Sequence, residues 1–432
     1  MARVGDTNYQ EMTAKSDALF LVACCSTAIV VGFGSIFVAS SYFGLGEIPL
    51  LISAQGADPP HSWGGVTPLG VHYAGDLLEA WRYAKGGSPW INRGMYPPFA
   101  YALLYPLTYM NYWISYVLLV LSGAVATCVL FWRGLTTLPS EIKVVAITIV
   151  VLMSQPMIVA VDRGSLLTLV VALALGGYMA FVQKRFTVAG VLFALAAGIK
   201  IYPVLFLLLL VRAKQWKALA VSVGVGLIAT VLPLMFFGDG IASNLYNWKV
   251  NFSSYQSLSP VYRDKNNSLL GLFDALQYSG FLGLTGFWES LANYHTLAMI
   301  GLLAITIWLC LLPKVSVLEI LLLIASVMYL SLNYAAPYSL IFLLLPVFAL
   351  LSGHYRDVVP RLYRRTYCVL VAVSLAPKNI PLFSLENVKI GTTVPTVATY
   401  VNPLLAVILI LIIAYRATRT ETEGKTIFAR PT

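Results

Sequence analysis

Residues 73–106 read YAGDLLEAWRYAKGGSPWINRGMYPPFAYALLYP, and this polar stretch interrupts a chain that is otherwise dominated by apolar segments. Asp76 stands at the beginning of a short helical pattern, 76–84, that a glycine pair ends. A stiff Tyr-Pro-Pro corner follows at 96–98, because each proline fixes its own φ and restricts the residue before it. Ionisable residues beside apolar chain mark functional sites in membrane proteins, so we expect the site to include this stretch.

The composition predicts the fold class. Hydrophobic residues make up 59% of the 432 residues and charged residues 11%, whereas an average soluble domain has about 25% charged residues. A chain with so few charges cannot cover one water-soluble core. We therefore expect an all-α, polytopic integral membrane protein, located in the cell membrane and surrounded by membrane lipid.

The formal net charge is +10, and most Lys and Arg residues fall in short gaps between apolar runs. This distribution is typical of cytoplasmic loops, so we expect no nucleic-acid partner. The five cysteines lie in apolar runs and lack both the spacing of metal ligands and a histidine partner. We therefore expect no metal site and no cofactor.

The apolar runs predict about 11–13 transmembrane or half-membrane helices in a single domain, 1–432, with long non-cytoplasmic loops at about 43–96, 238–294 and 377–399. The run 97–110 is short for a span and leaves two alternatives. If it crosses the membrane, Asp162 lies on the inside, and if it is the upper part of a kinked helix, Asp162 lies on the outside. Both alternatives keep the long loops on the non-cytoplasmic side.

The apolar run 187–211 is interrupted midway by Lys200 and Pro203, in the sequence GIKIYP. Proline breaks the hydrogen-bond ladder of a helix, and a lysine at bilayer depth is costly unless it faces a cavity or a partner. The sequence therefore predicts two half-helices that meet around Lys200.

Short motifs of polar residues, glycines and prolines recur between residues 70 and 350. They are Gly75-Asp76, the sequence GGSPW at 86–90, YPPF at 96–99, DRGS at 162–165, GIKIYP at 198–203 and NNSLLG at 266–271. In this order, these motifs resemble the membrane-embedded glycosyltransferases of the GT-C fold. The resemblance is closest to the bacterial polyprenol-phosphate-mannose-dependent α-mannosyltransferases.

The resemblance implies an inverting transfer of a hexosyl residue, with mannose as the favoured sugar. The donor is a polyprenyl-phosphate-linked sugar, and the acceptor is a hydroxyl of an envelope glycolipid or glycan on the non-cytoplasmic side. The family places a catalytic base in the first outer loop, where this chain has Asp76, and a basic site for the carrier phosphate, for which Lys200 is the candidate. Relatives often carry a histidine before a late outer helix, where residues 331–338 read SLNYAAPY and contain none.

The residues themselves leave alternatives open. Asp76 could cap a helix or pair with Arg82 or Lys85, and Asp58 is a rival base in the same loop. Arg163 is a second candidate for binding phosphate, or it tethers the adjacent Asp162. The candidates for contacting sugar or acceptor, each of which could instead be an ordinary surface, turn or belt residue, are Glu79, Tyr96, Asn267, Tyr334 and Tyr338.

Two other functions fit a protein of this kind. A flippase or transporter of lipid-linked sugars would use the same cavity and lysine but would need no base. A non-catalytic subunit of an envelope polysaccharide assembly would need neither the cavity with its lysine nor a base. The long outer loops with acids and the lack of an inverted sequence repeat favour the enzyme.

Overall fold

The computed structural model describes residues 4–43, 74–238, 240–256, 266–353, 359–380, 382 and 395–419. Within these residues the regular structure is helical and includes no β-strand, which confirms the predicted all-α class. Four helical segments in the described ranges are long and apolar enough to cross a membrane, and two bent helix pairs would each form one more span. The protein is therefore polytopic, as predicted.

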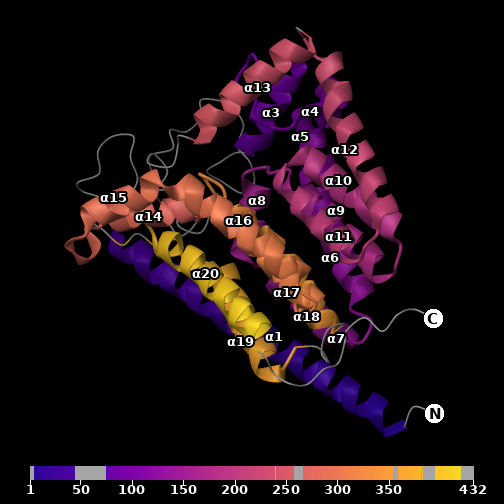
Figure 1. Ribbon diagram of the computed structural model, residues 1–432, viewed down its shortest axis with the longest axis vertical. Helices are drawn as coiled ribbons and strands as arrows, with labels where there is room; N and C mark the ends of the chain where they lie inside the picture. Colours follow the sequence, from indigo (N-terminus) through magenta and orange to yellow (C-terminus); the bar gives the residue numbers. More distant parts are fainter. Residues whose placement is uncertain are drawn as a thin grey trace.

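The first half of the bundle contains residues 74–106 and a bent span (Figure 1). A bend of 59° separates η3 from α8, and the proline in the first turn of α8 accounts for it, because proline cannot continue the preceding helix. The elements are α1 (Val4–Phe43), α3 (Gly75–Lys85), α4 (Pro98–Leu104), η1 (Tyr105–Tyr109), α5 (Tyr112–Tyr116), η2 (Val117–Leu121), α6 (Ser122–Gly134), α7 (Ser140–Ala146), η3 (Ile147–Leu152) and α8 (Gln155–Asp162).

The second half completes the bundle and ends in the last candidate span (Figure 1). Its first elements are α9 (Leu167–Val182), α10 (Phe186–Ile199), η4 (Tyr202–Leu207), α11 (Leu208–Arg212), α12 (Trp216–Phe236), α13 (Ile241–Gln256), α14 (Leu269–Tyr278) and η6 (Phe281–Gly283). The remaining elements are α15 (Thr285–Asn293), α16 (His295–Leu311), α17 (Val317–Leu330), η7 (Pro337–Leu343), α18 (Leu344–Ser352), α19 (Arg361–Leu375) and α20 (Val397–Thr418).

The short apolar run 97–110 forms α4 and η1 and does not cross the bundle. Twelve residues of α and 3-10 helix reach about 20 Å, which is less than the roughly 30 Å of a hydrocarbon core. The Ala74 N–H donates to the Asp162 carbonyl at 3.1 Å, so Asp162 lies on the same side as the first turn of α3. The alternative with a kinked helix is therefore the one that the structure adopts.

Helices occur within one of the segments that the sequence assigns to long outer loops. The polar segment 238–294 contains three helices, α13, α14 and α15, because polar helices outside the spans escape a search for apolar runs. Most of the predicted loop 43–96, including the rival base Asp58, and most of loop 377–399 lie outside the described residues.

The predicted break at Lys200 is confirmed. Helix α10 ends at Ile199, Lys200 has the extended angles φ −142° and ψ 129°, and η4 begins at Tyr202 with Pro203 in its first turn. The helix thus stops one residue before the lysine and restarts just after it, which leaves Lys200 at a bend between two half-helices.

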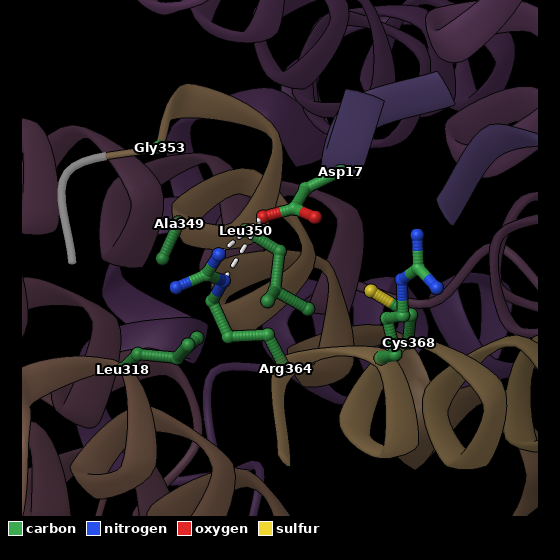
Figure 2. Close-up of a pocket in the computed structure, with 8 residues that line it drawn as sticks. Asp17, Leu318, Ala349, Leu350, Gly353, Arg364 and Cys368 are labelled. Atoms are coloured by element: carbon green, nitrogen blue, oxygen red, sulfur yellow. Dashed lines mark hydrogen bonds and ion pairs between the residues drawn. The ribbon is translucent and has the colours of Figure 1, made fainter. Parts of the chain in front are cut away.

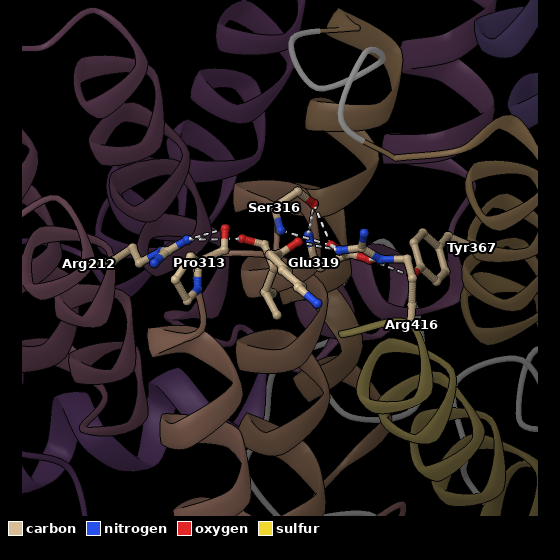
Figure 3. A network of polar contacts seen from close by, with 8 residues as sticks. Arg212, Pro313, Ser316, Glu319, Tyr367 and Arg416 are labelled. Atoms are coloured by element: carbon tan, nitrogen blue, oxygen red, sulfur yellow. Dashed lines mark hydrogen bonds and ion pairs between the residues drawn. The ribbon is translucent and has the colours of Figure 1, made fainter. Parts of the chain in front are cut away.

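Several basic gaps of the sequence meet at one end of the bundle, which we call the basic end (Figure 3). Arg212 donates to the carbonyls of Leu311 and Pro313, and Arg416 donates to the carbonyl of Lys314 and to Glu319. Glu319 is fully buried, caps α17 through Ser316, and also accepts from Tyr367 Oη at 2.8 Å. The α16–α17, α19 and α20 segments are therefore joined through one carboxylate.

Helix α17 connects this basic end to the opposite end of the bundle. It begins beside Glu319, rises about 20 Å over its 14 residues, and ends just before the segment 331–338. Every side chain from Leu318 to Leu330 is buried, so α17 is the enclosed centre of the second half. The candidate site lies at its far end.

Candidate active site

Asp76 lies in the first turn of α3, and this turn is joined to the segment that follows α8. The Ala74 N–H donates to the Asp162 carbonyl and the Asp76 N–H donates to the Arg163 carbonyl at 3.0 Å. Ala74 is the N-cap residue of α3 and adopts left-handed angles without a side-chain cap, so Asp76 is not the helix cap that the sequence left open. Gly164, at φ +67°, leaves room for Ala74, because a Cβ there would stand 2.8 Å from the Ala74 Cβ.

The Asp76 carboxylate pairs with Arg163. Arg163 Nε lies 3.2 Å from Asp76 Oδ1, and the two side chains are only 21% and 19% exposed. The contact involves Oδ1, so Arg163 orients the carboxylate of Asp76.

The guanidinium of Arg163 also lies near an aromatic ring of the late segment. Its Cζ is 5.9 Å from the ring centroid of Tyr338, which is the second residue of η7 and is 7% exposed. A cation over an aromatic face is attracted by the ring quadrupole. Tyr338 therefore restrains the side chain that in turn holds Asp76.

Lys200, at the break between the two half-helices, lies in the region of Asp76 and Arg163. Its Nζ lies 4.0 Å from the centroid of the Tyr96 ring, and its charge interacts with the Asp76 carboxylate. The approach of α10 to α4 is close at Gly198, where a Cβ would meet Phe99 at 3.1 Å. Asp76, Arg163 and Lys200 come from three distant parts of the sequence and form one charged cluster, flanked by Tyr96 and Tyr338.

Glu79 is exposed and lies one helical turn after Asp76. It accepts a hydrogen bond of 2.5 Å from Tyr83 Oη. Burial, together with this hydrogen bond, raises the pKa of Tyr83 well above its usual value, so the phenol stays a donor to Glu79. The binding of Glu79 to a sugar hydroxyl remains a prediction.

Asn267 and Tyr334 lie in a second, more buried layer. The Asn267 N–H donates to the Ala335 carbonyl at 2.8 Å, and its Oδ1 accepts from Asn402 Nδ2 at 2.8 Å. Asn267 is 1% exposed and Tyr334 is 9% exposed. These contacts brace the segment that ends in Tyr338, while a direct contact of Asn267 or Tyr334 with substrate remains a prediction.

Sequence reasoning missed two contributors. Tyr112 Oη donates to the Ala74 carbonyl at 2.8 Å and supports the turn before Asp76. His295, at the start of α16, places Nε2 3.2 Å from Asn333 Oδ1, so a histidine does reach the segment 331–338 from elsewhere in the chain. Each pair is separated by 38 positions, and no local pattern marks such a pairing.

Two further features of the described residues are candidates for parts of the site: possible metal ligands and a small cavity. Within the described ranges, no group of three or more His, Cys, Asp or Glu residues is placed to hold a metal ion. A cavity of about 10 Å³ lies at the basic end, where Asp17 pairs with Arg364 at 2.8 Å (Figure 2). That volume holds about one water molecule, so this cavity is not a sugar site.

Comparisons with known proteins identify the family of the chain. A search of curated proteins found no match to the chain. The family model described as glycosyltransferase family 87 matches residues 95–351, a range that includes Arg163, Lys200 and Tyr338 and begins after Asp76. Because this range is more than half of the chain, the protein belongs to glycosyltransferase family 87.

Proposed function

We propose that this membrane glycosyltransferase transfers a hexosyl residue, with mannose as the first candidate, from a polyprenyl-phosphate sugar to a hydroxyl of an envelope glycolipid or glycan. The observation that carries the proposal is the cluster of Asp76, Arg163 and Lys200. One carboxylate and one or two cations suffice for a single displacement on a sugar phosphate.

In the proposed reaction Asp76 is the general base. Its carboxylate takes the proton of the acceptor hydroxyl while the hydroxyl oxygen forms a bond to the anomeric carbon of the sugar. The bond between that carbon and the phosphate oxygen breaks, and the electron pair leaves with the polyprenyl phosphate. One displacement inverts the anomeric configuration.

Lys200 and Arg163 are proposed to stabilise the leaving phosphate. With Asp76 ionised, these three side chains carry a net charge of +1, which favours an approaching phosphate. The cations are held in place before the donor arrives, because Tyr96 lies against Lys200 and Tyr338 lies near Arg163. Such preorganised charges stabilise a transition state without the cost of reorienting at the moment of reaction.

The position of the cluster supports a donor that comes from the membrane. The basic end carries Arg212, Lys314 and Arg416, and the positive-inside rule assigns that end to the cytoplasm. The cluster lies at the opposite end of α17 and would then act on the non-cytoplasmic side, next to lipid-linked substrates.

The test uses purified protein in lipid vesicles, a radiolabelled polyprenyl-phosphate sugar and a glycolipid acceptor. The change Asp76→Asn removes the base, and we expect transfer to fall by about 10²–10⁴-fold, the usual contribution of general base catalysis. Glu141→Gln, an exposed acid in the first turn of α7, is the matched control and should keep the wild-type rate.

A flippase gives a different result in the same vesicles. It would move the labelled lipid across the bilayer in both the wild type and Asp76→Asn, with no product formed in either. Wild-type transfer rates in Asp76→Asn would remove Asp76 from the role of base.

A further inference from the structure

The loop between α3 and α4 carries Tyr96, and α13 holds this loop from outside. Trp248 Nε1 donates to the Met95 carbonyl at 3.2 Å. Asn251 Nδ2 donates to the carbonyls of Trp90, at 2.6 Å, and Gly94, at 3.2 Å. Figure 1 shows α13 beside α3 and α4, although more than 150 positions of sequence separate the bonded residues.

Helix α13 is itself anchored, so it can act as a support. Asn244 is fully buried, and its Nδ2 donates to the carbonyls of Leu234 and Phe237 at the end of α12. The helix therefore starts from a fixed point on a membrane span, and Trp248 and Asn251 follow at one and about two turns from Asn244.

Packed residues of the loop connect α13 to Tyr96. Trp90 is 1% exposed, packs edge-on against Tyr101 and Phe237, and donates from Nε1 to the Tyr96 carbonyl at 3.4 Å. Gly94 allows no side chain, because a Cβ would lie 2.4 Å from the Tyr101 hydroxyl. The path from Asn251 through Trp90 and Gly94 to Tyr96 is thus packed along its length.

We infer that Asn251 and Trp248 are positioning residues of the donor site. They hold the loop so that the Tyr96 ring stays over Lys200, and Lys200 stays directed at the phosphate of the donor. The inference rests on the proposed function, in which Lys200 binds the polyprenyl phosphate. Neither residue touches the substrate, so their effect should fall on donor affinity and not on the chemical step.

The experiment compares two identical changes on the same helix. Asn251→Asp keeps the shape of the side chain but removes the amide that donates to the loop and places a carboxylate against two carbonyl oxygens. Asn247→Asp adds the same charge to α13, where the native amide donates to Ser243 Oγ within the helix. Binding of a short-chain polyprenyl phosphate and hydrogen exchange of residues 86–96 are measured for both, in detergent.

We expect Asn251→Asp to weaken polyprenyl phosphate binding by about 10-fold, because the loop loses two amide hydrogen bonds and Tyr96 no longer holds Lys200 in place. Exchange in 86–96 should rise, the KM for the acceptor should stay unchanged, and kcat at saturating donor should change less than twofold. Asn247→Asp should match the wild type in every measurement. Asn251→Asp could prevent folding. In that case Trp248→Phe, which keeps an aromatic ring but loses the indole N–H that donates to Met95, should show the same effects with a smaller magnitude.

Three outcomes overturn the inference, and they differ in what else fails. A loosened loop with unchanged polyprenyl phosphate affinity, or no change in either measurement, rejects the positioning role and leaves the proposed function intact. Failure of the wild type to bind polyprenyl phosphate rejects the proposed donor and this inference with it.

Discussion

Lys200 Nζ lies 4.0 Å from the centroid of the Tyr96 ring, so the side chain at the half-helix break faces the residue that precedes the two prolines of the stretch 73–106. The two residues are brought together by the loop between α3 and α4 on one side and by the end of α10 on the other. This pair joins the two parts of the sequence that carry the strongest signals of function.

The first prediction concerns this pair. Lys200→Met should raise the dissociation constant of polyprenyl phosphate by about 10–100-fold, because a charged partner of the phosphate is lost. Tyr96→Phe keeps the ring and should bind nearly as the wild type, whereas Tyr96→Leu should lose a cation–π interaction of about 1–2 kcal/mol. Titration of the purified protein measures all three. Equal affinity in Lys200→Met and the wild type would exclude Lys200 from the phosphate site.

The second prediction concerns the pairing of Arg163 with Asp76. Arg163→Gln should lower kcat by about 10-fold or more, because the carboxylate loses its orienting partner and the leaving phosphate loses a charge. In an Asp76→Asn background the same change should cost much less, since residues that act as a unit are not additive. Arg185→Gln, in the exposed turn before α10, serves as the control. Additive losses in the double variant would mean that the two residues act independently.

The third prediction concerns the basic end. Glu319→Gln leaves the charge of Arg416 uncompensated at a nearly buried position and should lower the free energy of unfolding by about 3 kcal/mol. Thermal unfolding in detergent gives the measurement, and Glu289→Gln on the exposed face of α15 is the control. Because Glu319 is far from the cluster, the folded fraction should keep its kcat. A loss of kcat without a loss of stability would contradict this purely structural role.

The fourth prediction concerns Gly164. Gly164→Ala must adopt φ +67° and bring a Cβ to 2.8 Å from that of Ala74, so it should destabilise by about 1–2 kcal/mol and displace Arg163 from Asp76. Gly224→Ala, in α12 with no atom within 4 Å of the added Cβ, should be neutral or slightly stabilising. Transfer rate and melting temperature are measured together. Adding Ala74→Gly should restore part of the loss, and no difference between the two glycine variants would reject the steric explanation.

Local patterns in the sequence were enough to predict several features. The apolar runs predicted the all-α membrane fold, the pattern 76–84 predicted α3, and Lys200 with Pro203 predicted the broken helix. These features depend on neighbouring residues alone. The identification of Asp76 required the resemblance to a family as well, because an acid at a helix start has ordinary explanations.

Pairings across the fold could not be predicted in the same way. The sequence offered Arg82, Lys85 or a helix cap for Asp76, and offered Asp162 for Arg163, whereas Arg163 pairs with Asp76 from 87 positions away. Helix α13 was predicted as part of a loop, because its inward face carries Asn244, Trp248 and Asn251 in place of aliphatic residues. Such partners are distant in the sequence and meet only in the folded structure.

The burial of α17 on all sides has a consequence for the membrane in which the protein works. A helix with no side chain in contact with lipid does not tilt or shift to match the thickness of the surrounding bilayer. The vertical distance between Glu319 and Tyr338 is therefore a property of the protein. In thinner or thicker bilayers the outer helices would adjust, and the distance between the basic end and the Asp76–Arg163 pair would stay the same.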